Sequence, residues 1–131
     1  METCIFCKIA KGEIPSYKIY EDALFFAFLD IHPRVKGHTL LIPKKHYPWV
    51  YDVPEFEKYW GVALKITKVM QKTLTPKFVT YVTHGLEVSH AHIHIMPRKK
   101  ETEMVPSIKT FSADDMEQIA QTIKKGFDSK E

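Results

Sequence analysis

The chain has 131 residues, 44% of them hydrophobic and 12% aromatic, so it is long enough and apolar enough to bury the core of one domain. Its formal net charge of +3 is small, and its short lysine and arginine runs are isolated, which argues against a nucleic-acid-binding surface. No apolar run approaches the roughly 18 residues of a membrane span, and no signal peptide is visible. We therefore predict a single domain over residues 1–131, cytoplasmic, with neither nucleic acid nor a membrane as its partner.

The N-terminal third predicts three strands. Residues 17–21 alternate in polarity and residues 24–29 form an apolar run, with a short turn between them, as in a β-hairpin. A loop over residues 30–37 follows. Residues 38–42 then read as a third, largely buried strand that Pro43 ends.

The middle of the chain changes to helical spacing. Apolar residues recur at intervals of three and four between Glu55 and Leu74, which predicts one long helix. Asp52 is the expected N-cap, with Glu55 as its capping-box partner, and Pro76 ends the helix.

The last elements complete an α+β pattern. Residues 78–82 and 90–96 predict two more strands, and Ser112 with Asp115 predicts the start of an amphipathic C-terminal helix. The sum is an antiparallel five-stranded sheet with one long central helix and a C-terminal helix. No glycine-rich phosphate-binding motif of the Rossmann or P-loop type is present.

Three histidines, His90, His92 and His94, alternate with apolar residues in the fifth expected strand. Alternation places them on one face of the sheet, about 6.6 Å apart in succession. A solvated face does not require histidine, so this row indicates a functional site. Two chemistries remain open on these residues alone: metal binding, and nucleophilic attack on phosphorus by a neutral imidazole.

The only cysteines, Cys4 and Cys7, form a CxxC pair. A thioredoxin-like redox site would need a strand before the pair, and residue 4 leaves no room for one. The pair suits half of a tetrahedral metal site, although CxxC alone is weak evidence.

The histidine row resembles the signature of the histidine triad (HIT) family of nucleotide hydrolases and transferases. The likeness covers nearly the whole chain and is similar to the bacterial branch of histidine triad nucleotide-binding proteins. The matching segments are Cys4-Ile-Phe-Cys7-Lys-Ile, Gly12-Glu-Ile-Pro15, Tyr20-Glu-Asp22, Phe28-Leu-Asp30-Ile31, Gly37-His-Thr-Leu-Leu-Ile-Pro-Lys-Lys-His46, and the triad with Pro97-Arg98.

The resemblance implies roles for several residues. His92 is the expected nucleophile, which forms a nucleotidyl-histidine, with its Nδ1 proton held by the backbone carbonyl of His90. His94 is expected to contact the α-phosphate, and Asp30 the ribose hydroxyls of a purine nucleotide. The expected base pocket consists of Ile5, Phe6, Leu29, Ile31 and Leu40, all of which a core would also explain.

The resemblance also implies a structural zinc and a dimer. His46 and His90 would complete a Cys2His2 site with Cys4 and Cys7. A homodimer is expected in which the long helix and the fourth strand join two sheets.

The loop before the triad departs from the family. It is shorter, Leu86 stands in place of a glutamine, and Glu87 stands in place of a hydroxyl residue near the phosphate. Glu87 suggests that this position binds a cationic or amine leaving group, or acts as its proton donor. His38 and His84 are interpreted as structural.

The leading interpretation is a hydrolase of purine nucleoside 5′-phosphoramidates or similar nucleotidyl adducts. The alternatives are a dinucleoside polyphosphate hydrolase or nucleotidyl transferase, a largely non-catalytic nucleotide-binding scaffold, and metal-dependent hydrolysis on the triad itself.

Overall fold

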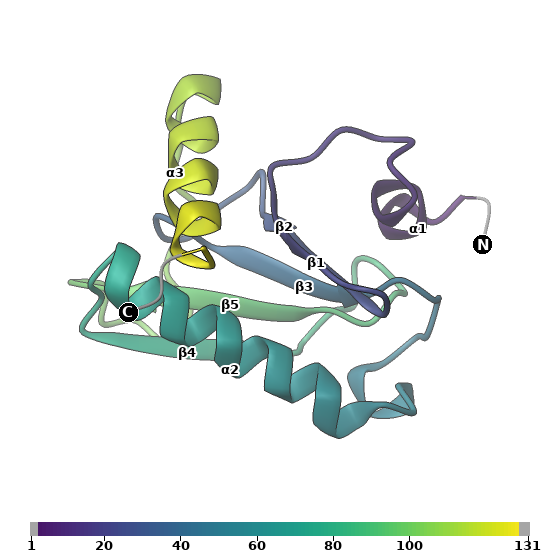
Figure 1. Ribbon diagram of the computed structural model, residues 1–131. Helices are drawn as coiled ribbons and strands as arrows, with labels where there is room; N and C mark the ends of the chain where they lie inside the picture. The colour runs from purple at the N-terminus through teal and green to yellow at the C-terminus, as the bar shows by residue number, and fades with distance from the viewer. Residues whose placement is uncertain (1–2, 129–131) are drawn as a thin grey trace.

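The computed structural model describes residues 3–128. A five-stranded antiparallel sheet, in the spatial order β1-β2-β3-β5-β4, lies at its centre (Figure 1). The strands are β1 (Lys18–Glu21), β2 (Phe25–Leu29), β3 (Thr39–Pro43), β4 (Phe78–Val82) and β5 (Ile93–Arg98). The helices are α1 (Ile5–Ala10), α2 (Phe56–Thr73) and α3 (Ala113–Gly126), and a short 3-10 helix, η1, spans Val50–Asp52. The predicted α+β class is confirmed.

The sheet separates two apolar layers, as β2 shows. Phe25, Ala27 and Leu29 belong to the larger core, which α2 and α3 cover. Phe26 and Phe28 point to the opposite face and pack in a smaller cluster with residues of α1. Period-two alternation explains the division, because successive side chains of a strand leave on opposite faces.

The long helix α2 starts at Phe56, and the predicted N-cap at Asp52 is wrong. Asp52 ends η1 instead, and the residue before α2, Glu55, makes no side-chain capping bond. Val53 precedes Pro54 and is extended, with φ −74° and ψ 119°. A residue before proline avoids the α conformation, so a helix that begins at Asp52 cannot continue through Val53.

The C-terminal helix α3 begins as predicted. The hydroxyl oxygen of Ser112 accepts the backbone N–H of Asp115 at 3.0 Å. Met116, Ile119 and Ile123 lie on the buried face of α3 and pack into the core beside α2 and β1. Within the described residues, no helix is long and apolar enough to span a membrane.

The fifth strand begins at Ile93, later than the predicted start at residue 90. Its partner β3 ends at Pro43, which has no N–H to extend the ladder. The N–H of Ala91 bonds instead to the carbonyl of Tyr47 at 2.7 Å. The first two histidines of the row therefore lie on a segment that leads into β5, and only His94 lies in the strand.

Candidate functional site

A hydrogen bond from one ring nitrogen fixes the orientation of the His92 side chain. Its Nδ1 lies 2.7 Å from the backbone carbonyl oxygen of His90, so Nδ1 carries the proton and donates it. Burial lowers the pKa of His92, opposed by this hydrogen bond, so the ring is neutral near pH 7. The remaining nitrogen, Nε2, then carries the lone pair that a nucleophile needs.

His38 and His94 form a hydrogen-bonded pair in which the proton positions follow from their partners. The backbone N–H of Arg34 donates to Nδ1 of His38 at 3.0 Å. An amide N–H only donates, so the proton of neutral His38 lies on Nε2. That Nε2 lies 2.9 Å from Nδ1 of His94, which accepts, so the proton of His94 lies on its own Nε2.

The two neighbouring triad rings therefore have opposite tautomers. His92 offers a lone pair on Nε2 and His94 offers an N–H on Nε2, and their ring centroids are 5.1 Å apart. A lone pair suits attack on phosphorus, and an N–H suits a phosphate oxygen that gains negative charge. The arrangement combines a nucleophile with an anion-stabilising donor.

The chain of hydrogen bonds from Arg34 through His38 to His94 requires that both imidazole rings are neutral. Burial, followed by a neighbouring histidine and by Arg34, lowers the pKa of His38 to about 3 and that of His94 to about 4. A protonated His38 would carry a proton on Nδ1 and could not accept from Arg34. At neutral pH the chain of donors from Arg34 to His94 is intact.

Asp30 lies at the edge of the same cluster. Its Oδ1 accepts the backbone N–H of His32 at 2.9 Å, and its Oδ2 lies 3.6 Å from Nε2 of His38. Burial raises the pKa of Asp30, partly offset by the bond from His32. Asp30, His38 and His94 together offer three atoms close enough to be considered as metal ligands.

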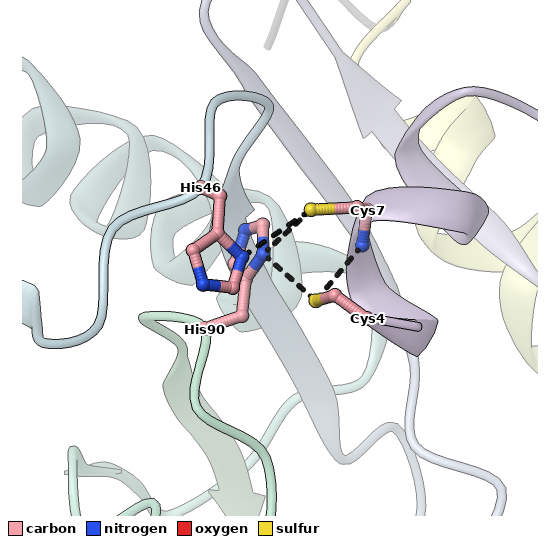
Figure 2. A group of neighbouring side chains, drawn as sticks. All are labelled: Cys4, Cys7, His46 and His90. Atoms are coloured by element: carbon pink, nitrogen blue, oxygen red, sulfur yellow. Dashed lines mark hydrogen bonds between the residues drawn. The ribbon is translucent and has the colours of Figure 1, made fainter. Parts of the chain in front are cut away.

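A second cluster brings together Cys4, Cys7, His46 and His90, as Figure 2 shows. The Sγ–Nδ1 distances are 3.4 Å for Cys4–His90, 3.3 Å for Cys7–His46 and 3.5 Å for Cys7–His90. A tetrahedral zinc ion, about 2.3 Å from sulfur and about 2.0 Å from nitrogen, separates such atoms by about 3.5 Å. The predicted four residues thus converge at distances that fit one ion.

The surroundings of His90 also suit a metal. Its Nε2 donates to the carbonyl oxygen of Pro43 at 2.8 Å, which leaves the lone pair of Nδ1 directed at the thiols. Burial lowers the pKa of His90 to about 4 and raises the pKa of the Cys7 thiol. Since the His90 carbonyl also holds His92, the cluster and the nucleophile share one residue.

The residues of the predicted base pocket do not all lie on one face of the sheet. Phe6 and Leu40 pack in the cluster on the histidine face, and the Phe6 ring meets the His92 ring edge-on with centroids 5.1 Å apart. Ile5 and Ile31 are 45% and 67% exposed, as residues at a rim would be. Leu29 is a correction, because it lies on the opposite face of β2, buried in the larger core.

The loop before the triad passes directly over His92. A Cβ atom added to Gly85 would lie 2.3 Å from Cε1 and 2.7 Å from Nε2 of His92. Leu86 is 71% exposed, and Glu87, also exposed, is near enough for its negative charge to favour the protonated form of His92. The loop thus approaches the reactive nitrogen through backbone at Gly85.

The sequence does not predict that His38, Arg34 and Gly85 take part in the candidate site. His38 was interpreted as structural, yet it bonds to His94, and the backbone of Arg34 sets its tautomer. The signal was available: His38 and Leu40 share a face of the third strand, and Leu40 is paired with His94. Nothing in the sequence indicated the contact of Gly85, which depends on the loop conformation.

Fold and site together define a class: a small α+β protein with a row of buried or half-buried histidines on one face of an antiparallel sheet. Residues 11–101 match the HIT domain, and the chain belongs to the HIT family.

Several proteins with HIT-family names are similar to this chain. An uncharacterized HIT-like protein of Methanocaldococcus jannaschii is 38% identical over 92% of this chain and 98% of its own length. The adenosine 5′-monophosphoramidase HNT1 of Saccharomyces cerevisiae is 41% identical over 75% of this chain and 64% of its own length. Among solved structures, a Zn-bound histidine triad family protein of Mycobacterium smegmatis superposes with a TM-score of 0.83 at 27% identity, covering 97% of this chain and 94% of that one.

Proposed function

We propose that this protein hydrolyses purine nucleoside 5′-phosphoramidates, or similar nucleotidyl adducts, through a nucleotidyl-His92 intermediate. The observation that carries the proposal is the 2.7 Å bond from Nδ1 of His92 to the His90 carbonyl, which leaves Nε2 as the nucleophilic nitrogen. The yeast relative named adenosine 5′-monophosphoramidase supports the substrate class.

The reaction has two steps. Nε2 of His92 attacks the α-phosphorus, a bond forms between them, and the P–N bond to the leaving amine breaks as the amine takes up a proton from solvent. The N–H of His94 stabilises the charge on a non-bridging oxygen. Water then attacks the same phosphorus, the bond to His92 breaks, and the mononucleotide is released with His92 neutral again.

The nucleotide is expected to lie over the α1 face of the sheet. Phe6 and Leu40 supply a buried apolar surface for the base, and the exposed side chains of Ile5 and Ile31 form its rim. The carboxylate of Asp30, next to the His38–His94 pair, is placed to accept hydrogen bonds from the ribose hydroxyls. These assignments remain proposals for binding residues.

The charge of Glu87 favours an amine leaving group over a polyphosphate. A carboxylate near His92 repels a leaving group that carries several negative charges, as in a dinucleoside polyphosphate, and attracts a protonated amine. The Glu87→Gln variant should therefore reduce the ratio of kcat/KM for a phosphoramidate to kcat/KM for a dinucleoside polyphosphate. Equal turnover of both substrates by the wild type would favour the alternative hydrolase.

The deciding experiment is release of AMP from adenosine 5′-phosphoramidate by the wild type and by His92→Ala. We expect turnover in the first and none in the second, and a nucleotidyl adduct of the wild type detectable by mass spectrometry after rapid acid quenching. Tight AMP binding without turnover in the wild type would favour the nucleotide-binding scaffold instead.

We also propose that the Cys4, Cys7, His46 and His90 cluster holds one structural zinc ion. The distances, the acceptor behind His90 and the thiol donors fit that ion, and the Zn-bound relative supports it. Zinc would join the start of α1 to the segment that carries the nucleophile. Elemental analysis of wild type and Cys4→Ser, purified without chelator, tests this, and equal metal content would refute it.

A second copy of the chain is the proposed protein partner, and the cytoplasm its proposed setting. The strand β4 lies at one edge of the sheet, and Tyr81 on it and Leu64 on α2 are exposed. Unpaired edges with large apolar side chains favour pairing with another chain. Leu64→Lys should reduce the mass measured by light scattering from dimer to monomer, whereas Met104→Lys, at an exposed apolar control position, should not.

A further inference from the structure

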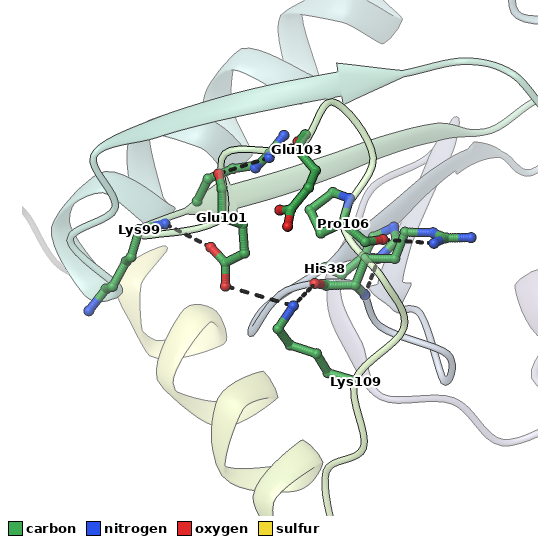
Figure 3. A network of polar contacts seen from close by, with 8 residues as sticks. His38, Lys99, Glu101, Glu103, Pro106 and Lys109 are labelled. Atoms are coloured by element: carbon green, nitrogen blue, oxygen red, sulfur yellow. Dashed lines mark hydrogen bonds and ion pairs between the residues drawn. The ribbon is translucent and has the colours of Figure 1, made fainter.

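The segment after the triad strand, residues 99–111, returns to the site although most of it lies beyond the matched HIT domain. We refer to it as the 99–111 loop. Arg98, at the end of β5 and 2% exposed, anchors its first half by donating to the carbonyls of Glu101, Glu103 and Met104. Figure 3 shows this part of the loop with Glu101, Glu103, Pro106 and Lys109, and the contacts of Pro106 and Lys109 go to Arg34, which bonds to His38.

The second half of the loop is bonded to the peptide unit that sets the tautomer of His38. The backbone N–H of Lys109 donates to the carbonyl of Pro33 at 2.6 Å. The N–H of that same peptide, which belongs to Arg34, donates to Nδ1 of His38 at 3.0 Å. In a trans peptide the C=O and N–H point in opposite directions, and no described peptide is cis, so holding the carbonyl directs the N–H at His38.

Two further bonds fix Arg34 itself. The Nζ of Lys109 donates to the carbonyl oxygen of Arg34 at 2.9 Å, and Nη1 of Arg34 donates to the carbonyl oxygen of Pro106 at 2.7 Å. The carboxylate of Glu101, 4.0 Å from Nζ of Lys109, adds an ion pair on the loop side. Both carbonyls that flank the Arg34 N–H are therefore held by one residue, Lys109.

The orientation of this peptide decides which proton His94 carries. If the peptide turned over, a carbonyl would face Nδ1 of His38 and require a proton there. Nε2 of His38 would then accept from Nδ1 of His94, and His94 would present a lone pair, which repels a phosphate oxygen, in place of an N–H.

We propose that Lys109 is a positioning residue for the catalytic histidines. It holds the Pro33–Arg34 peptide so that His38, and through it His94, keeps its proton on Nε2. The kinetic part of this inference rests on the proposed hydrolase function, whereas the tautomer part does not.

The test uses a graded set of variants of the whole chain. Lys109→Met removes the side-chain donor, Lys109→Pro removes the side-chain and backbone donors, and Lys109→Arg keeps both. Lys100→Met, at an exposed lysine of the same loop, is the matched control. Long-range proton–nitrogen NMR spectra report which ring nitrogen of His94 is protonated, and AMP release from adenosine 5′-phosphoramidate gives kcat and KM.

We expect His94 to be protonated on Nε2 in the wild type, Lys109→Arg and Lys100→Met. In Lys109→Met a second tautomer of His94 should appear, and kcat should fall about fivefold with KM changed less than about twofold. In Lys109→Pro the second tautomer should be more populated and kcat should fall further. An unchanged tautomer in Lys109→Met and Lys109→Pro overturns the proposal, even if kcat falls, because the loss is then only structural. A wild type without AMP release refutes the hydrolase, and the NMR result still decides the role of Lys109.

Discussion

Two histidine clusters lie side by side in this protein, and the partner behind each imidazole makes them chemically different. In the Cys4, Cys7, His46 and His90 cluster, a carbonyl of Pro43 lies behind His90 and accepts its Nε2 proton. In the Asp30, His38 and His94 cluster, an amide N–H of Arg34 lies behind His38 and donates to it. The backbone acceptor leaves a lone pair on Nδ1 of His90, on the side away from Pro43. The backbone donor leaves an N–H on Nε2 of His38, on the side away from Arg34.

The difference suits the first cluster to a cation and the second to an anion. An acceptor behind the ring frees a lone pair at the front, which a metal ion requires. A donor behind the ring puts a proton at the front, which excludes a metal at that nitrogen and suits a hydrogen bond. The His38 and His94 nitrogens are 2.9 Å apart, a hydrogen-bond distance, and the sulfur–nitrogen distances of 3.3–3.5 Å in the other cluster are close to the separation of about 3.5 Å between ligands of one zinc ion. A metal ion held by Asp30, His38 and His94 would have to displace the proton between the two imidazole rings.

The first expected effect is an almost complete loss of bound metal from a variant of the Cys4, Cys7, His46 and His90 cluster. Cys7→Ser should reduce bound metal from about one equivalent to less than about a tenth, because a hydroxyl replaces a thiolate ligand. His38→Ala should keep the full equivalent. Titration with cobalt(II), read by its thiolate and ligand-field absorption, checks both variants. Loss of the cobalt spectrum in His38→Ala would contradict the division of the two clusters.

The next effect reverses the donor that faces His94. Glutamate at position 38 only accepts, so His38→Glu should draw the His94 proton to Nδ1 and lower kcat by about 100-fold. His38→Gln keeps an N–H donor and should stay within about tenfold of wild type. Steady-state kinetics on adenosine 5′-phosphoramidate measure this, with metal content as the control. Equal loss in both variants would mean that the polarity of the group at position 38 has no role.

A smaller effect acts on His92, which lies between the clusters. Gly85→Ala places a methyl group 2.7 Å from Nε2 of His92, so the loop or the ring must move. We expect kcat/KM to fall about tenfold with metal content unchanged. Gly61→Ala, where an added Cβ meets nothing within 4 Å, is the control and should keep full activity. Wild-type kcat/KM in Gly85→Ala would show that the loop is free to move away.

Much of the fold could be predicted because its signals are local. Continuous apolar runs predicted the strands around Phe28 and Leu40, spacing predicted α2, and the hydroxyl of Ser112 predicted the start of α3. The first helix, α1, was not predicted, since it spans only six residues and the pair of thiols dominated the interpretation of that segment. Leu29 was assigned to the wrong face because a continuous apolar run conceals the alternation.

The resemblance implies the residues of the candidate site and one proton position, that of Nδ1 of His92, but not the proton positions of His38, His90 and His94. The spacing of His90, His92 and His94 indicates a shared face, and the resemblance adds Asp30. Tautomers depend on backbone groups distant in sequence: the Pro43 carbonyl is 47 residues from His90. Side-chain identities do not show where a backbone N–H points, so the roles of Arg34 and Lys109 required three-dimensional contacts.

The smallest effect is in the pH dependence of stability. The folded-state pKa values of His38 and His94 are lowered to about 3 and about 4, from an unfolded value of about 6.5. Between these values the unfolded chain binds protons that the native protein does not, so their contribution is full above pH 6.5 and is lost as the pH falls toward 4.

Each such histidine adds a slope of at most about 1.4 kcal/mol per pH unit in the free energy of unfolding. Urea unfolding at pH 7, 6 and 5 should therefore show a shallower decline for His38→Gln than for wild type. Acid sensitivity of the metal ligands is common to both proteins at equal metal content, so it cancels in their difference. Parallel declines would mean that His38 is protonated as readily in the native protein as in the unfolded chain, and that the donor behind its ring does not hold it neutral.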